Sequence, residues 1–520
     1  MLDLKSYSRF LPTSQFIFLN LILGVGHFLV LLNAGAYLPM LPYISGTTEE
    51  AIGYVVWGQS DYFTAMGAAF LIGRHVMRRY GPKNVAIFAY VLFGTASLAA
   101  FYSIPHFALY TAARATQGFA AGLSILPSFF LLVEFYREAH INIAASLWSL
   151  AVFVPLSLGP TLGGWLSYEI GDWRLLLTTS SITAFCVGAT LWALLADWQD
   201  KVAPSPTFFR AVCLFLVFFA AVISLQEFFD VAILSDLSSR FEPLWWLCFS
   251  FALLAWLFWV ANQHSEVPLI SPLLFTYSNY ALGMFLLCTA FIFVQGSFVQ
   301  YIIRLQTVEG YTAWHAGLLM LPIFLFSKPL SLLAEKKIQK GRDPRLFACI
   351  SFIAFVVYFW WISETVRPAP WEALLWPQFL EGAALGLLFV SMTAITICHV
   401  PAAEQLHAVD TLNAARNLAG GFAITFSDLG WDFLSAYEQN WLGGPDASNG
   451  WRLSLLSQAS TTQLIRLTSE RQASLLALND LFHVLVVVFA ALAILIWWTC
   501  PPKKRLPQDM PILEHLGEEP

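Results

Sequence analysis

The chain has 520 residues, of which 58% are hydrophobic and only 12% are charged, and its mean hydropathy is +0.66. A soluble domain carries roughly 25% charged residues, so this composition indicates a protein that lies mostly in a lipid bilayer. The net charge of −6 gives no signal for nucleic-acid binding. The seven cysteines include no CxxC pair, which gives no signal for a zinc site, and the sequence has no glycine-rich phosphate loop of the kind found in ATPases. We find no nucleophile–base set and no metal-ligand cluster, so we expect no enzyme, no cofactor and no metal.

Fourteen apolar segments are long enough to form membrane-spanning helices, because a spanning helix needs about 20 mostly apolar residues. The polar N-terminus before the first of them has no small-residue cleavage site, which predicts an uncleaved first helix. The predicted spans are 15–40, 51–73, 84–104, 107–133, 143–168, 175–196, 208–228, 243–262, 280–302, 313–334, 345–363, 372–398, 408–430 and 478–499.

Basic residues are distributed unequally between the two sets of connecting segments. Eighteen lysine and arginine residues fall on the side of the termini and seven fall on the opposite side. Because basic residues accumulate in cytoplasmic segments, both termini are predicted to be cytoplasmic. The one long external connection, 431–477, contains a candidate amphipathic helix at 460–478. It is either a solvated loop or a docking surface for a periplasmic partner.

Two pairs of segments relate the first part of the chain to the last part. GRHVMRRYGPKN, which contains Gly81, aligns with LAEKKIQKGRDP, which contains Gly341. TQGFAAGL, which contains Gly118, aligns with LEGAALGL, which contains Gly382. The separations of 260 and 264 positions agree within four residues. They exceed a six-helix half by about 60 residues, which fits two helices inserted between two parallel repeats.

The predicted fold is therefore all-α and integral to the membrane, with fourteen transmembrane helices in two six-helix pseudo-repeats plus two inserted helices. The predicted parts are an N-terminal six-helix half at 1–200, the inserted helices at 201–265, a C-terminal six-helix half at 266–500 that includes the external segment 431–477, and a cytoplasmic tail at 501–520.

The fifth predicted span contains the segment LGPTLGGW. Gly159 and Gly163 lie four positions apart on one helix face, with Pro160 and Gly164 beside them. Such a face lets another helix approach closely, and the proline weakens one turn of the backbone ladder. The pattern G-P-x-x-G-G resembles the fifth-helix signature of antiporters in the major facilitator superfamily.

Four further motifs extend this resemblance over the whole chain. RHVMRRYGPK, after the second span, is similar to the superfamily's loop element, and ARATQGFAAG in the fourth span is similar to the family's R-x-x-Q-G-x-x-x-G. PQFLEGAALG and NAARNLAGGF are similar to motifs of the twelfth and thirteenth helices of EmrB-like proteins. The chain thus resembles the fourteen-helix drug:proton antiporter branch, whose known members export hydrophobic toxins, uncouplers, dyes or siderophores using proton uptake.

The chain departs from the family pattern at two positions. Arg78 occupies the position of the loop element's usual aspartate, which removes the residue that makes the charge latch between the halves in the general family. Asn33 occupies the position of the usual carboxylate in the first-helix signature, and an amide cannot carry a proton.

Two acidic residues within predicted spans are the candidates for carrying the proton. Asp61 lies near the middle of the second span, and Glu381 lies in the twelfth span, where it aligns with Gln117. A charge at mid-membrane costs about 2.5–3.5 kcal/mol and usually marks a pathway or an ion pair. Asp61 could replace the carboxylate lost at Asn33, or it could be a structural partner of a polar residue such as Gln59 or Asn33.

Arg114 in the fourth span is a third intramembrane charge. The resemblance implies a role in proton relay and gating, and the alternative is a structural ion pair with Asp61 or Glu381. Asp61, Glu381 and Arg114 are therefore the predicted proton-coupling residues. The predicted conformational and gating residues are Gly159, Pro160, Gly163, Gly164, Gly118, Gly122, Arg78, Arg79, Gly81 and Arg416. The candidates for lining a substrate cavity are Asn33, Tyr37, Trp57, Tyr62, Gln117 and Phe298.

These observations predict a proton-driven exporter of hydrophobic or aromatic toxic compounds in a bacterial inner membrane, working by alternating access between two halves. Two alternatives stay open. One is a dedicated siderophore or metabolite exporter, and the other is the inner-membrane component of an envelope-spanning assembly. The expected partners are a small hydrophobic substrate, protons and membrane lipids, and for the assembly a periplasmic membrane-fusion adaptor and an outer-membrane channel.

Overall fold

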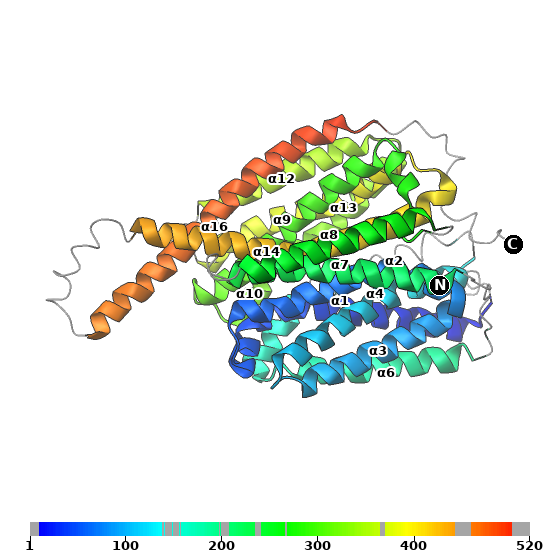
Figure 1. Ribbon diagram of the computed structural model, residues 1–520, viewed down its shortest axis with the longest axis horizontal. Coiled ribbons are helices and arrows are strands. Elements are labelled where there is room, and N and C mark those ends of the chain that lie inside the picture. The colour runs from blue at the N-terminus through cyan, green and yellow to red at the C-terminus, as the bar shows by residue number, and fades with distance from the viewer. Residues whose placement is uncertain are drawn as a thin grey trace.

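The computed structural model describes residues 10–137, 158–196, 207–234, 241–265, 268–364, 370–442 and 459–501, together with residues 140, 148, 155 and 198. The regular elements within these ranges are all helical. Figure 1 shows long helices running roughly along one axis, with the first helices of the chain on one side of the bundle and the last helices on the other. The end at which α1 begins is called the inner end below, and the opposite end is called the outer end.

The first half contains α1 (Thr13–Thr48), α2 (Ile52–Tyr80), α3 (Pro82–Tyr102), α4 (Phe107–Glu134), the π-helical turn η3 (Leu166–Ile170) and α6 (Leu175–Leu194). The inserted helices are α7 (Phe208–Leu234) and α8 (Phe241–Gln263), followed by the short turn η4 (Pro272–Thr276). The second half contains α9 (Tyr280–Thr307), α10 (Ala313–Leu319), α11 (Leu321–Gln339), α12 (Pro344–Ser363), α13 (Trp371–Ile397), α14 (Ala402–Leu442), α16 (Ala459–Leu495) and η6 (Ile496–Trp498).

Within the described ranges, eleven helical segments are long and apolar enough to cross a membrane. The helices α2 and α14 are long enough but more polar, and they pack against each other between the two halves. Several of their polar side chains, such as Gln59, Ser60 and Asn417, are buried. The fifth predicted span lies largely outside the described residues, apart from its outer part from residue 158 onward. The prediction of an all-α fold with fourteen spans is confirmed, whereas the domain boundaries stay a prediction.

Two predicted segments differ in detail from the structure. The span predicted at 313–334 is divided into α10 and α11 at Met320, because the proline in the first turn of α11 has no N–H to continue the helix. The segment 431–477, predicted as an external loop, is helical at both ends. α14 continues for 41 residues to Leu442, and α16 begins at Ala459, one residue before the predicted amphipathic helix. Figure 1 shows these two helix ends projecting beyond the other helices at the outer end.

The aligned glycines of the two halves occupy equivalent positions. Gly81 and Gly341 both end a helix with positive φ, 82° and 84°. A Cβ atom on Gly118 would overlap the backbone of Tyr62 on α2, and one on Gly382 would overlap the backbone of Ile323 on α11. Each half therefore brings two helices into direct backbone contact at the same place in the repeat.

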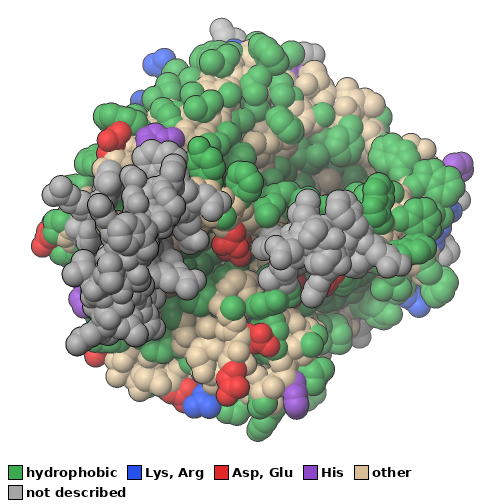
Figure 2. All heavy atoms as spheres, turned by 60° about the vertical axis from the view of Figure 1, so that its left-hand side comes forward, with side chains coloured by type: hydrophobic (Ala, Val, Ile, Leu, Met, Phe, Trp, Pro, Cys, Tyr) green, Lys and Arg blue, Asp and Glu red, His purple; other side chains and the backbone are tan. Residues whose placement is uncertain are grey.

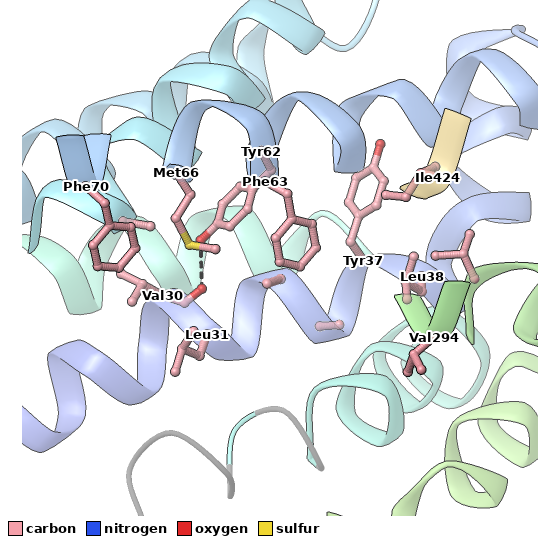
Figure 3. Packing of buried hydrophobic residues seen from close by; sticks show 14 of the residues in the cluster. Val30, Leu31, Tyr37, Leu38, Tyr62, Phe63, Met66, Phe70, Val294 and Ile424 are labelled. Atoms are coloured by element: carbon pink, nitrogen blue, oxygen red, sulfur yellow. Dashed lines mark hydrogen bonds between the residues drawn. The ribbon is translucent and has the colours of Figure 1, made fainter. Parts of the chain in front are cut away.

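The halves meet along α2 and α14, and the inserted helices lie beside this boundary (Figure 1). A Cβ atom on Gly67 of α2 would come within 2.7 Å of the backbone nitrogen of Leu418 on α14, so the two backbones are in close contact. Figure 3 shows the apolar core beside them, where Tyr37 and Leu38 of α1 lie near Val294 of α9 and Ile424 of α14. With the outer end turned toward the viewer, Figure 2 shows a mostly hydrophobic surface with acidic side chains and few basic ones.

Candidate functional site

A buried arginine lies at the centre of the first half. Arg114 on α4 is fully buried, and its guanidinium carbon lies 4.3 Å from the ring centroid of Tyr37 on α1 and 4.8 Å from that of Tyr62 on α2. Both distances are within the range of a cation–π interaction. Each phenol is fixed by a hydrogen bond to a backbone carbonyl, from Tyr37 to Val55 and from Tyr62 to Val30, and Figure 3 shows the second of these.

Two glutamines hold the guanidinium group from the other sides. Arg114 donates from Nη1 to Gln117 Oε1 at 2.7 Å and from Nη2 to Gln59 Oε1 at 3.3 Å. The amide nitrogens of these glutamines are used in turn, because Gln117 donates to Ser97 Oγ and Gln59 donates to the carbonyl of Ala34. The network therefore fixes each amide with its oxygen toward the cation.

Among the described residues, Arg114 has no carboxylate partner, so the ion pair with Asp61 or Glu381 that was the alternative is not formed. Its Nε is buried without a hydrogen-bond partner in the described part of the chain. The described groups in direct contact with this buried cation are neutral, and it is sensitive to any negative charge placed near it, since the interior screens charge weakly.

Asp61 has different neighbours from those expected. Its Oδ1 accepts a hydrogen bond of 2.8 Å from Nε2 of Gln226 on the inserted helix α7. The two partners considered for it, Gln59 and Asn33, are bonded to other groups. Asn33 donates to Ser180 on α6 at 2.6 Å, which turns this side chain into the interior of the first half. Asp61 therefore lies at the boundary between α2, α7 and α14.

Glu381 on α13 lies in the interior of the second half. It is 1% exposed, and within the described structure its Oε1 has no hydrogen-bond partner. The phenol groups of Tyr358 on α12 and Tyr301 on α9 are its neighbours. Beyond Tyr301, toward the outer end, Arg304 and Glu309 form an ion pair of 3.1 Å in which both side chains are 1% exposed. The second half thus contains a chain of buried ionisable groups.

The glycines of the fifth helix contact two different helices. Cβ atoms on Gly159 and Gly163 would overlap the backbone of α1 at Gly35 and Ala36, and one on Gly164 would overlap Ala313 of α10. The hydroxyl of Thr161 also donates to the carbonyl of Gly317 on α10, at 3.1 Å. The outer part of this helix therefore joins the two halves. The gating role of this segment, including Pro160, stays a prediction.

The remaining predicted residues are spread over the bundle. Arg78 and Arg79 are exposed at the inner end, and Gly81 ends α2. Gly122 packs on the backbone of α2 at Met66. The guanidinium carbon of Arg416 lies 5.3 Å from the ring centroid of Phe389. Of the cavity candidates, the structure brings together Tyr37, Tyr62 and Gln117 around Arg114. Asn33, Trp57 and Phe298 lie elsewhere, and Trp57 contacts the ring of Tyr54 near the outer end of α2.

One ion pair between the halves was not predicted. Arg74, at the inner end of α2, forms an ion pair with Asp410 on α14. The sequence signal was present, because an arginine opens the loop element and an aspartate lies inside the predicted span 408–430. Their proximity could not be predicted, since 336 positions separate them.

Apolar helices in two halves that meet around buried charged and aromatic side chains define a multi-pass membrane transporter. The chain belongs to the Major Facilitator Superfamily, whose sequence profile matches residues 23–424. Membership of this transporter superfamily confirms the prediction that the protein is not an enzyme.

Three curated relatives match nearly the whole chain. The multidrug export protein EmrB of Haemophilus influenzae is 25% identical over 497 residues, covering 94% of this chain and 96% of EmrB. EmrB of Escherichia coli is 25% identical over 507 residues, covering 95% and 97%. The fatty acid resistance protein FarB of Neisseria gonorrhoeae is 24% identical over 495 residues, covering 93% and 96%. The prediction of an EmrB-like chain is confirmed.

Solved structures agree with the fold. A D-xylose-proton symporter superposes with a TM-score of 0.58 at 14% identity, covering 94% of this chain and 99% of the symporter. A bacterial homolog of the human lysosomal transporter Spinster, in an inward-facing and occupied conformation, superposes with a TM-score of 0.60 at 12% identity, covering 93% and 97%. At these identities the likeness concerns the fold alone.

Proposed function

We propose that the protein is a proton-driven exporter of hydrophobic or aromatic compounds in a bacterial inner membrane, with both termini in the cytoplasm. The observation that carries the proposal is the nearly full-length similarity to proteins named for multidrug export and fatty acid resistance. Substrate leaves by alternating access while a proton moves inward.

The region between the halves suits an apolar or aromatic substrate. In the view of Figure 3, Tyr37 and Leu38 from the first half lie near Ile424 and Val294 from the second. Aromatic and aliphatic walls bind such molecules by surface burial and stacking, and they place few demands on the positions of polar groups. This arrangement supports a broad class of hydrophobic substrates.

The proton-coupling proposal rests on Asp61, Glu381 and Arg114. Asp61 lies on α2, the helix that packs against the second half, whereas Glu381 is enclosed inside the second half. Burial favours the protonated form of a carboxylate, and the buried cation of Arg114 responds to a change of charge in its surroundings. We assign proton exchange to Asp61, with Glu381 as the second carboxylate and Arg114 as the relay.

Alternating access needs contacts that form and break between the halves. Gly164 of the fifth helix closes the outer end against α10, and the Arg74–Asp410 pair joins the inner ends of α2 and α14. Glycine contacts suit this task because bare backbones separate without breaking side-chain bonds. We assign gating to these two contacts.

A second candidate function is that of the inner-membrane component of an envelope-spanning assembly with a membrane-fusion adaptor and an outer-membrane channel. The projecting outer ends of α14 and α16 favour it (Figure 1). Co-purification with a periplasmic helical-hairpin adaptor distinguishes it from a pump that acts alone. A dedicated siderophore or metabolite exporter would transport one compound from a panel of dyes, uncouplers, fatty acids and siderophores and reject the others.

The experiment is uptake into inverted membrane vesicles, energised by a proton gradient, with a panel of dyes, uncouplers, fatty acids and siderophores. We expect gradient-dependent uptake that collapses when the gradient is removed. Asp61→Asn should abolish uphill transport and spare substrate binding, because the amide has the shape of the carboxylate but does not titrate. Glu381→Gln should have the milder effect. Normal pumping by Asp61→Asn with loss in Glu381→Gln moves the coupling role to α13. Normal pumping by both variants would exclude these two carboxylates as the proton-coupling groups.

A further inference from the structure

The inserted helix α7 supplies a side chain to the surroundings of Asp61. Gln226 is 5% exposed, and its Nε2 donates to Asp61 Oδ1 at 2.8 Å and to Ser60 Oγ at 3.1 Å. The hydroxyl of Ser60 donates in turn to the carbonyl of Gly421 on α14, at 2.8 Å. One amide on the inserted helix is therefore connected to both helices that join the two halves.

Apolar contacts hold α7 at the same place. The ring of Phe229, one turn after Gln226, lies 4.7 Å from the ring of Phe426 on α14, in an edge-to-face arrangement. Gly421 allows the close approach of α2, since a Cβ atom there would overlap the hydroxyl of Thr64. The position of Gln226 relative to Asp61 is thus set by packing as well as by its hydrogen bonds.

The groups that face Asp61 can be named from each neighbouring helix. α7 contributes Gln226 and the carboxylate of Glu227, α4 contributes the cation of Arg114, and α1 contributes the phenol of Tyr37. Of these, Gln226 is the group in hydrogen-bonding contact with the Asp61 carboxylate. A neutral N–H donor binds a carboxylate more strongly than a carboxylic acid, because hydrogen bonds to charged acceptors are roughly twice as strong.

We propose that Gln226 is a positioning residue for the proton-binding group Asp61, through which the inserted helix α7 responds to the protonation state of α2. This rests on the proposed exchange of a proton at Asp61. When Asp61 is ionised, the charge-assisted bond holds α7 against α2 and α14. When a proton binds to the carboxylate, that bond weakens and α7 is held less firmly at the boundary where the halves move.

The test measures protonation of Asp61 directly in the full-length protein in lipid nanodiscs. The carboxylic acid C=O band in the infrared spectrum is followed across pH, and the Asp61 component is identified by its loss in Asp61→Asn. Gln226→Met removes the donor while keeping a similar length. It should raise proton affinity about tenfold, moving the band's midpoint to higher pH, since a hydrogen bond to a charged group is lost. Gln226→Asn, which withdraws the amide by one methylene, should shift the midpoint in the same direction by less.

The matched control is Gln300→Met on α9, because Gln300 donates to Asp428 on α14 in an amide–carboxylate pair of 3.2 Å that does not involve the inserted helices. It should leave the Asp61 band unchanged. An unchanged midpoint in both Gln226 variants, or an equal shift in the control, overturns the proposal. Proton-driven transport is measured in parallel. A Gln226-dependent shift without proton-driven transport supports the positioning role and rejects the proposed function, whereas transport with no shift rejects the positioning role alone.

Discussion

Arg74 on α2 and Asp410 on α14 form an ion pair that joins the two halves at the inner end, with Arg74 Nε 3.0 Å from Asp410 Oδ2. The side chains are 17% and 9% exposed, so the pair is largely shielded from water. In this chain an arginine, Arg78, replaces the aspartate that usually makes the latch between the halves. Here the first half supplies the cation and the second half supplies the anion.

Breaking this pair should disturb the inner contact. Arg74→Ala leaves the Asp410 carboxylate without its partner, at a cost of about 3 kcal/mol, and should favour separation of α2 from α14 at the inner end. The distance between spin labels on the two helices, measured in nanodiscs, is the readout. The double exchange Arg74→Asp with Asp410→Arg should partly restore the wild-type distance. Equal distances in wild type and in both variants would show that the pair does not hold the halves together.

The fifth-helix glycines should tolerate no side chain. Gly163→Ala places a methyl group against the backbone of Ala36, and such overpacking costs about 1–3 kcal/mol, so transport should fall roughly tenfold while membrane insertion stays normal. Gly24→Ala on α1, where a Cβ atom meets nothing within 4 Å, is the matched control and should transport normally. Full activity of Gly163→Ala would mean that this close contact is not needed for transport.

The Arg114 network should require arginine and not merely a positive charge. Arg114→Lys keeps the charge but cannot bond both Gln59 and Gln117 in one plane between two rings, so the transport rate should fall about tenfold. Arg174→Lys, at an exposed position near the outer end, is the control and should behave as wild type. Initial rates in inverted vesicles provide the measurement. A wild-type rate for Arg114→Lys would show that transport requires only a positive charge at this position.

Asp343 should make stability depend on pH. It caps α12 and accepts hydrogen bonds from Arg345, of 2.9 Å from the backbone nitrogen and 2.7 Å from Nη2. Burial alone would raise the pKa of Asp343, but the bonds from Arg345 outweigh it and the pKa lies below the ordinary 3.8. The stabilisation is therefore present above pH 3.8 and is lost as the pH falls through the lowered pKa.

Asp343→Asn keeps a good helix cap but loses the charge, so its thermal unfolding temperature should lie below that of wild type at neutral pH. The difference should shrink in acid, as the wild-type carboxylate is protonated. The matched control is Asp172→Asn, because the Asp172–Arg174 pair is 39% and 47% exposed and contributes little. A difference between Asp343→Asn and wild type that stays constant from neutral to acidic pH would contradict the assignment.

Much of the fold could be predicted from local pattern. Apolar length marks the spans, and the glycine spacing of Gly159 and Gly163 identifies the face that contacts α1. The helices α2 and α14 are the instructive case. They pack on each other and are more polar than their neighbours. Their lower hydropathy makes them harder to recognise as spans in the sequence.

The candidate site was harder to predict, because its contacts join distant positions. The hydrogen bond between Gln226 and Asp61 spans 165 positions, and nothing near Gln226 in the sequence distinguishes it from other polar residues at a helix end. Of the partners considered for Asp61, Gln59 is near in sequence and Asn33 lies on the preceding predicted span, and the ion pair considered for Arg114 was inferred from charge alone. Among the described residues, tyrosines and glutamines surround Arg114 without a carboxylate partner, an outcome that residue type does not reveal.

The length of α14 has a mechanical consequence. Its 41 residues make one continuous rod of about 60 Å, twice the roughly 30 Å of a bilayer's hydrocarbon core. The rod carries Asp410 near its inner end, and its outer end projects beyond the other helices (Figure 1). Each degree by which the rod tilts about its inner end displaces its outer tip by about 1 Å. A small rearrangement at the inner ion pair thus produces a larger displacement of the outer tip, which moves any molecule bound there.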